Sequence, residues 1–432
     1  MNFIFLYADT MLMVNGKHNK SLLPVYLVGL CKGKYTLKQA SESTGYSENW
    51  LCILKHKYLQ EGFSCLENKN KFRPAPNKKP EALRQQIVAI YQTTFQDVNF
   101  TYFRKCLSEL YDIQISIPTL AKIMNDYGIY SPETRKKKRV KKSKRPRIRR
   151  ECEGDLIQID GTPFQWFYKF GDNKRYCLTG SIDDATGKIT GLYMTEHECL
   201  YGYLEIMRQT CNSYGVPREI YSDRAAIFCV TPKQKRGHKE LDRWEQLAVI
   251  HDERTQWQRI LSELNINQIL AWSPEAKGRV ERMWRTIQGQ LPVWLKLHGA
   301  SDMAKANAIL KNYIAEFNSS YSVPPAIDDP FWIDAPENLD NILQCKIPRY
   351  TDSVGVIKFH SYKFAVDAPF VCHKNVLLCI SERGLFAELD GKMYPVHCLD
   401  EYLYDGRGET VPQVVKDIIY RYMYAYAKEI SA

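Results

Sequence analysis

The sequence predicts a multidomain protein. α-Helical modules come first, an α/β core with a mixed five-stranded sheet flanked by helices follows, and a small β-barrel comes last. The length of 432 residues is enough for roughly two to four domains. The apolar spacing changes near residue 151 from a helical period of about 3.6 residues to short strand-like runs. A dense basic block at 135–150 separates the part of the sequence with helical spacing from the part with strand-like runs.

The composition is that of a globular chain, with 44% hydrophobic and 12% aromatic residues. It has no run of about 18 apolar residues, so we expect no membrane-spanning segment. The apolar start, MNFIFLYADTMLMV, lacks a preceding basic region and is interrupted by Asp9, which favours a packed first element over a signal peptide. Thirteen scattered cysteines without a CxxC pair indicate reduced thiols in the cytoplasm.

Residues 1–66 are predicted to form a helix-turn-helix module. In the segment 35–63, a short helix starts near Leu37, Gly45 supplies the turn, and Ser47 caps a second helix. In a DNA-binding module of this kind, the second helix enters the major groove. Many small helical hairpins without such a role have the same pattern.

Residues 80–134 are predicted to form a second three-helix module, of the helix-turn-helix or winged-helix type. Its last helix has Ser116 as a capping residue, Pro118 in the first turn and Gly128 at its end. Two adjacent modules ahead of a basic segment favour DNA binding more than either does alone. A purely structural bundle is the alternative for one of them.

The basic block, RKKKRVKKSKRPRIRR at 135–150, contains twelve basic residues and no acid. Because the whole chain carries +11, the rest of the chain is close to neutral. Like charges at this density repel one another and leave little apolar surface to bury, so we interpret the block as a linker that becomes ordered on a polyanion. A solubilising tail or a nuclear-import signal is the alternative, which the position between domains disfavours.

The core is predicted at 151–320. Its strand patterns are DLIQID, RYCLTGSID, KITGLYM, REIYSD and NQILAW, and the helix patterns LYGYLEIMRQTCNSYG and TQWQRILSELNI precede the last two strands. In such a layered architecture the fourth strand can lie parallel to the first. The two strands would then be neighbours, with Asp160 and Asp223 together at their ends.

The segment 273–291, SPEAKGRVERMWRTIQGQL, begins like a helix capped by Ser273 and places one acid, Glu281, among arginines. Lys277, Glu281 and Arg285 are four residues apart and share one helix face. One explanation is an ordinary ladder of surface ion pairs. The other is a metal ligand surrounded by cations that bind phosphate.

Four segments distinguish these explanations, because together they resemble the retroviral-integrase superfamily of DDE transposases, whose members share an RNase H-like fold. The matching segments are LIQIDGT, LTGSIDDATGKITGLY, PREIYSDRAAIF and SPEAKGRVERMWRTI. The resemblance spans roughly 150–300, and the whole chain is most similar to bacterial insertion-sequence transposases with an N-terminal helix-turn-helix.

The resemblance implies that Asp160, Asp223 and Glu281 are both the catalytic residues and the metal ligands. Three carboxylates from separate elements can hold two Mg²⁺ ions about 4 Å apart, because Mg²⁺ prefers hard oxygen ligands; Mn²⁺ is expected to substitute. The implied reaction hydrolyses DNA strands to free 3′-OH ends and joins these ends to target DNA.

DNA contacts are expected from polar and basic residues of the two helical modules, the linker and the last core helix. They are Asn49, Lys55, Lys57, Lys122, Arg135, Lys136, Lys137, Lys138, Arg139, Lys141, Lys142, Lys144, Arg145, Arg147, Arg149, Arg150, Lys277, Arg279, Arg282 and Arg285.

The spacing departs from the family pattern, because an unusually long stretch of 57 residues separates Asp223 from Glu281. We interpret 229–254 as an insertion that contacts DNA, contacts another subunit or is decoration. Asp183 and Asp184 fall in a predicted hairpin turn, where aspartate side chains commonly bond the local backbone. We therefore expect a structural role for both.

Residues 345–405 read as four or five short strands, with turns at HS, ERG and DG. This resembles the small SH3-like barrel that follows the core in related transposases; a β-domain without DNA contact is the alternative. The tail, 411–432, is expected to be an amphipathic helix, although its alternating tyrosines also suit a strand.

These observations together predict a Mg²⁺-dependent DNA transposase that binds terminal inverted repeats. It would be a prokaryotic, cytoplasmic, nucleoid-associated protein without membrane contact, acting as at least a dimer on double-stranded DNA. Two alternatives remain: a non-catalytic DNA-binding regulator derived from a transposase, and an RNase H-like nuclease without strand transfer.

Overall fold

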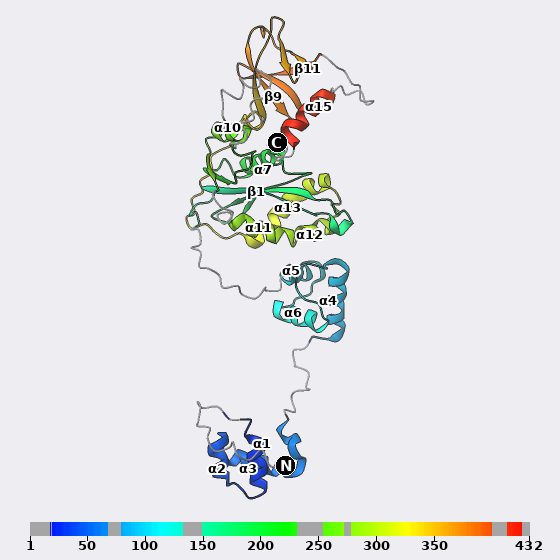
Figure 1. Ribbon diagram of the computed structural model, residues 1–432, viewed down its shortest axis with the longest axis vertical. Helices are drawn as coiled ribbons and strands as arrows, with labels where there is room; N and C mark the ends of the chain where they lie inside the picture. The colour runs from blue at the N-terminus through cyan, green and yellow to red at the C-terminus, as the bar shows by residue number, and fades with distance from the viewer. Residues whose placement is uncertain are drawn as a thin grey trace. The chain divides into compact units, whose positions relative to one another are not determined.

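The computed structural model describes residues 18, 20–67, 79–132, 149–230, 254–271, 278–399 and 413–425. The chain divides into two compact units, Met1–Arg84 and Gln85–Ala432 (Figure 1). Several predictions lie outside the described residues. They are the linker at 135–148, most of the insertion at 229–254, the start of the helix at 273–277 with Ser273 and Lys277, the segment 400–412 and the end of the tail at 426–432.

The described residues of the first unit include the α-helices α1 (Leu23–Cys31), α2 (Leu37–Thr44) and α3 (Glu48–Glu61). The predicted helix start near Leu37, the turn at Gly45 and the cap at Ser47 are confirmed. Thr36 caps α2 through a reciprocal pair of bonds with Gln39. Gly45 ends α2 with a φ of 79°, and Ser47 caps α3. Buried Ala40 and Leu51 join the two helices in the core of this unit.

The second module consists of α4 (Glu81–Thr94), α5 (Phe100–Tyr111) and α6 (Ile117–Asp126). Ser116 caps α6 and Pro118 lies in its first turn, as predicted. Gly128 follows the helix with a φ of 75°. Residues 79–132 contain no strand, so the wing of a winged helix is absent from this range.

The core sheet contains β1 (Leu156–Phe164), β2 (Tyr176–Asp183), β3 (Ile189–Thr195), β4 (Glu219–Ser222) and β5 (Asn267–Leu270). Its order is β3-β2-β1-β4-β5. β1 pairs antiparallel with β2 and parallel with β4. The predicted mixed five-stranded sheet, with the first and fourth strands as parallel neighbours, is therefore confirmed.

Helices cover both faces of this sheet (Figure 1). On one face lie α7 (Leu200–Ser213) and α10 (Gln256–Glu263). On the other lie α11 (Gly278–Gln288), α12 (Leu291–Leu297) and α13 (Met303–Tyr321). Side chains alternate along a strand, so Ile157 and Ile159 of β1 join the α7 side, while Gln158 between them faces α11.

β1 is longer than the sequence indicated, because it continues past Asp160 to Phe164. Its pairing with β4 stops at Gln158, but its pairing with β2 continues to the end. One side of β1 is therefore an open edge beyond that point. Pro163 is tolerated there, since an edge position needs no ladder donor.

The C-terminal part has six strands, not the four or five predicted. They are β6 (Cys345–Tyr350), β7 (Val356–Phe359), β8 (Tyr362–Val366), β9 (Asn375–Ser381), β10 (Gly384–Leu389) and β11 (Lys392–Cys398). The antiparallel order β6-β9-β10-β11-β8-β7 gives a barrel-like sheet. The predicted turn at His360 and Ser361 joins β7 to β8 and is two residues long, with both φ angles positive.

The tail is helical in its described part, as predicted. It consists of α15 (Gln413–Ile419) and a π-helical turn, η4 (Tyr420–Tyr424). In the ranges that the structure describes, no helix is both long and apolar enough to cross a membrane.

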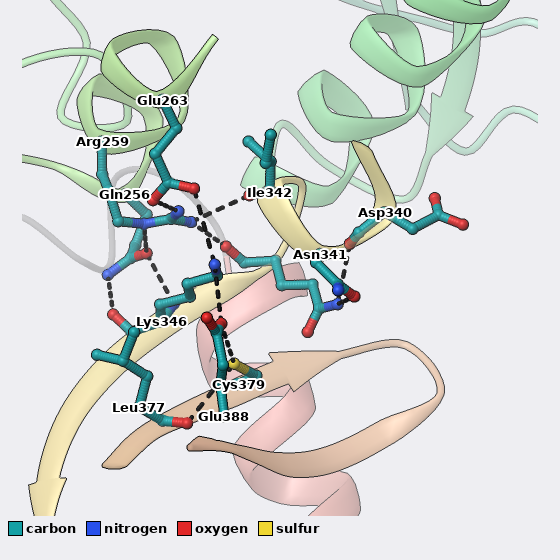
Figure 2. A network of polar contacts seen from close by, with 11 residues as sticks. Gln256, Arg259, Glu263, Asp340, Asn341, Ile342, Lys346, Leu377, Cys379 and Glu388 are labelled. Carbon is teal, nitrogen blue, oxygen red and sulfur yellow. Dashed lines mark hydrogen bonds and ion pairs between the residues drawn. The ribbon is translucent and has the colours of Figure 1, made fainter. Parts of the chain in front are cut away.

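A network around Arg259 joins the core to the barrel-like sheet (Figure 2). This arginine of α10 pairs with Glu263 and donates to Gln256 Oε1 at 3.0 Å. Its other nitrogen donates to the backbone oxygens of Ile342 and Gln344, just before β6. The Arg259 side chain is only 15% exposed, so these bonds form largely away from water.

Candidate active site

Asp160 and Asp223 lie on neighbouring parallel strands. Gln158 of β1 pairs in register with Tyr221 of β4. The Asp160 side chain faces the α11 side of the sheet. Asp223 directly follows β4, and Asp160 lies two residues beyond the last β1–β4 pair, so both aspartates follow the same end of that pairing. Both are half-buried.

Helix α11 lies along β1 on that side of the sheet. Three hydrogen bonds join the helix to the strand. Their donor residues are four positions apart along the helix, and their acceptor residues are two positions apart along the strand. They join Val280 N to Gln158 Oε1 (3.4 Å), Trp284 Nε1 to Asp160 Oδ2 (3.0 Å) and Gln288 Nε2 to Thr162 Oγ1 (3.0 Å). Four residues of helix rise about 6.0 Å and two residues of strand about 6.6 Å, so the spacings match.

A glycine on β2 allows this close approach. Gly180 pairs with Asp160 in the β1–β2 ladder. A Cβ at Gly180 would lie 2.7 Å from Trp284 Cη2 and 2.9 Å from Leu192 Cδ2. Only a residue without a side chain leaves room for the indole ring that bonds the Asp160 carboxylate.

Glu281 lies on α11 one helical turn before Trp284, and its side chain is exposed. The structure therefore brings the helix of Glu281 to the strand of Asp160. It does not gather the three carboxylates, because among the described residues no group of three His, Cys, Asp or Glu side chains is placed to hold a metal ion. The elements that carry Asp160 and Glu281 are thus adjacent, but the three acids form no ligand cluster among the described residues.

Asp183 has the predicted role in the turn between β2 and β3. Its carboxylate accepts from the Thr186 backbone N–H and hydroxyl, both at 2.7 Å, and from Gly154 N at 3.0 Å. Burial raises the pKa of Asp183, while these hydrogen bonds oppose the increase. The side chain fixes the turn and is closed off from solvent.

Asp184 differs from the sequence prediction, because its side chain does not bond the local turn backbone in any described contact. It accepts from Arg150 N at 3.0 Å, Gln158 Nε2 at 2.8 Å and Arg279 Nε at 2.9 Å. The carboxylate is 1% exposed and therefore belongs to the interior. It joins the chain after the linker, the middle of β1 and the first turn of α11.

Among the predicted DNA contacts near the core, Arg282 and Arg285 are exposed on α11. Arg279 on the same helix is paired with buried Asp184 and is only 19% exposed. At the end of the linker, Arg149 donates to the Ala185 backbone oxygen at 3.2 Å. Arg150 forms ion pairs with Asp155 and Glu219. On α11 the arginines that face the solvent are thus the two further along the helix, and Arg149 at the end of the linker is also exposed.

In the helical modules, Asn49 and Lys57 are exposed on α3, Lys55 is half-buried, and Lys122 is exposed on α6. The other predicted DNA contacts lie outside the described residues. They are Arg135, Lys136, Lys137, Lys138, Arg139, Lys141, Lys142, Lys144, Arg145, Arg147 and Lys277.

Sequence reasoning missed two residues that organise this site. Gln158 is 1% exposed in the middle of the apolar strand LIQID, and a buried amide in such a run signals a specific polar partner. Trp284 lies three residues after Glu281, which places it on an adjoining part of the same helix face. Both signals were present in the sequence, but their partners are distant along the chain.

Two characterised sequences are similar to this chain over most of its length. "Putative transposase y4bF" of Sinorhizobium fredii is 31% identical over 338 residues, which are 78% of this chain and 70% of the relative. "Transposase for insertion sequence IS1202" of Streptococcus pneumoniae is 26% identical over 432 residues, covering 91% of this chain and 90% of the relative. No family model matches the chain.

Solved structures of retroviral integrases are also similar to parts of the chain. The HTLV-2 integrase catalytic core domain in complex with magnesium is 16% identical, with a TM-score of 0.24, over 39% of this chain and 86% of that one. The simian T-cell lymphotropic virus intasome, in complex with a PP2A regulatory subunit, is 13% identical, with a TM-score of 0.29, over 71% and 95%. These scores are too low to support a structural argument.

The sequence relatives define the class of protein. The identity to the Sinorhizobium fredii relative is above 30% and covers more than two thirds of both chains. The chain belongs to the transposases.

Proposed function

We propose that this chain binds the terminal inverted repeats of a transposable element, hydrolyses DNA strands to free 3′-OH ends and joins those ends to target DNA. One observation carries the proposal beyond family membership. Helix α11, which carries Glu281, is bonded to the strand of Asp160 through Trp284 Nε1, and β4, which Asp223 follows, pairs in parallel with that strand. These neighbouring elements support the assignment of the three acids to one site.

The donor set suits a hard divalent cation, because all three predicted ligands are carboxylates. Asp160, Asp223 and Glu281 would hold two Mg²⁺ ions, or Mn²⁺ in their place. Bound ions would lower the pKa of the attacking hydroxyl and stabilise the leaving oxygen. Since Glu281 is exposed in this structure, its side chain has to turn toward the aspartates for all three to bind the same ions.

The protein's own residues would orient the reactants. Trp284 Nε1 donates to Asp160 Oδ2 and so limits the rotation of that carboxylate. Exposed Arg282 and Arg285 on the same helix would position phosphates on either side of the scissile bond. The helical modules and the linker would bind the terminal repeats, and two ends cut together would require at least a dimer on DNA.

The test is a cleavage and joining assay on a linear duplex that carries the DNA flanking the gene, with Mg²⁺ and the full-length protein. Joined products support a transposase. Cut products alone would indicate a nuclease, and binding without cleavage would indicate a regulator.

In the same assay Asp160→Asn is expected to abolish cutting and joining while DNA affinity remains, because an amide is a poor ligand for Mg²⁺. Exposed Asp329 in the second unit provides the matched control, and Asp329→Asn should react at the wild-type rate. Full activity of Asp160→Asn would refute the assignment of the site.

A further inference from the structure

We propose that Asp184 is a positioning residue that sets the first turn of α11, and with it Glu281, and that Arg279 acts as its partner and not as a DNA contact. This inference rests on the proposed function of the site. Asp184 and its neighbours form the segment SIDDATG, whose conspicuous acids the proposed reaction leaves without a role.

The buried carboxylate of Asp184 is built to hold three parts of the chain at once. It is 1% exposed and accepts three hydrogen bonds of 2.8–3.0 Å, from Arg150, Gln158 and Arg279. A buried charge is retained only when it is paired and bonded in this way. Losing the carboxylate would therefore release β1, α11 and the end of the linker from one another.

Asp184 also determines which way the Gln158 amide points. A carboxylate only accepts, so Gln158 must present its Nε2 to Asp184 and its Oε1 to the opposite side. That oxygen accepts from Val280 N in the first turn of α11. The first N–H groups of a helix have no partner within the helix, so this bond anchors the start of α11 to the strand.

Two tethers therefore converge on the first turn of α11, and both depend on Asp184. One is the Arg279 ion pair, and the other runs through Gln158 to Val280. Glu281 is the next residue along the helix. Without Asp184, the nearest remaining bond to β1 is that of Trp284, one turn later, and the Glu281 carboxylate would be less well placed for ion binding.

The experiment compares full-length Asp184→Asn, Arg279→Gln and Arg279→Lys with the wild type. Asp329→Asn is the control for cleavage, and Arg282→Gln, at a proposed phosphate contact, is the comparison for DNA binding. Cleavage rate is measured against Mg²⁺ concentration. Asp184→Asn and Arg279→Gln are expected to lose roughly 10- to 100-fold in rate or in apparent Mg²⁺ affinity, as is typical when a partner of a metal ligand is removed. Arg279→Lys should recover most of that loss, since it can still pair with Asp184.

DNA binding separates positioning from phosphate contact. Removal of one phosphate contact lowers the slope of log K against log salt by about 0.9. Arg282→Gln should show that change, and Arg279→Gln should keep the wild-type slope. A reduced slope for Arg279→Gln would overturn the proposal, as would wild-type cleavage by Asp184→Asn at every Mg²⁺ concentration.

Hydrogen exchange gives a readout that does not need cleavage. Amides in the first turn of α11 should exchange faster in Asp184→Asn and Arg279→Gln than in the wild type, and unchanged exchange would overturn the proposal. Wild-type protein that binds DNA without cutting it would refute the proposed function alone. Should Asp184→Asn fail to fold, the two Arg279 variants carry the same comparison.

Discussion

Replacing Gly180 with alanine tests how closely α11 is held against the sheet. The added Cβ would lie 2.7 Å from Trp284 Cη2, about 0.7 Å inside ordinary van der Waals contact at 3.4 Å. It would also lie 2.9 Å from Leu192 Cδ2, so two neighbouring side chains would have to give way. The indole ring, and α11 with it, has to move away from Asp160.

Overpacking of this kind costs about 1–3 kcal/mol. Alanine also reduces the entropy of the unfolded chain, which offsets about 0.4–1 kcal/mol. We therefore expect the packed state of α11 to be destabilised by about 1–2 kcal/mol in total, which corresponds to a roughly 5- to 30-fold change in the opening equilibrium of α11.

Hydrogen exchange of a peptide that spans α11 measures this change in the full-length protein. Gly278→Ala is the matched control, because Gly278 is exposed at the start of the same helix and an added Cβ meets nothing within 4 Å. Alanine there should slow exchange or leave it unchanged, since its helix propensity exceeds that of glycine by about 1 kcal/mol. Wild-type exchange of α11 in Gly180→Ala would refute the close packing described here.

Iodoacetamide should label exposed Cys372 first at pH 8, because burial raises the pKa of Cys211 and Cys345 to about 12 and leaves only about one thiolate in ten thousand. Equal labelling rates by mass spectrometry would contradict this. Arg259→Gln should lower the free energy of unfolding by about 3 kcal/mol, because it leaves a partly buried network without its cation (Figure 2). Arg383→Gln, at a residue 81% exposed, should change stability by less than about 0.5 kcal/mol, and equal losses in chemical denaturation would count against the network.

The strands and helices of the core could be predicted from the sequence because each carries a local signal. Alternating or continuous apolar runs mark the strands, and Gly45, Ser47 and Ser116 mark helix ends through turn and cap chemistry that depends on near neighbours. The parallel pairing of β1 with β4 also followed, since few connections are allowed in a layered α/β fold. The neighbouring positions of the strands before Asp160 and Asp223 could therefore be predicted in advance.

Long-range polar contacts could not be predicted in the same way. Asp184 resembles an ordinary turn residue until Arg279, 95 positions later, is seen beside it. Arg279 in turn has the same local surroundings in sequence as exposed Arg282, so nothing local distinguishes an internal ion pair from a surface charge.

Because the hydrogen-bond spacings along α11 and β1 match, the helix can slide along the strand only in whole steps of that spacing. A slide by one step, about 6 Å, would set Trp284 beside Gln158 and carry Glu281 equally far from its original place. A smaller slide would leave every donor between two acceptors, and the insertion of one residue would rotate the following face by about 100°. Sliding of the helix along β1 therefore moves the Glu281 carboxylate by a full step or not at all.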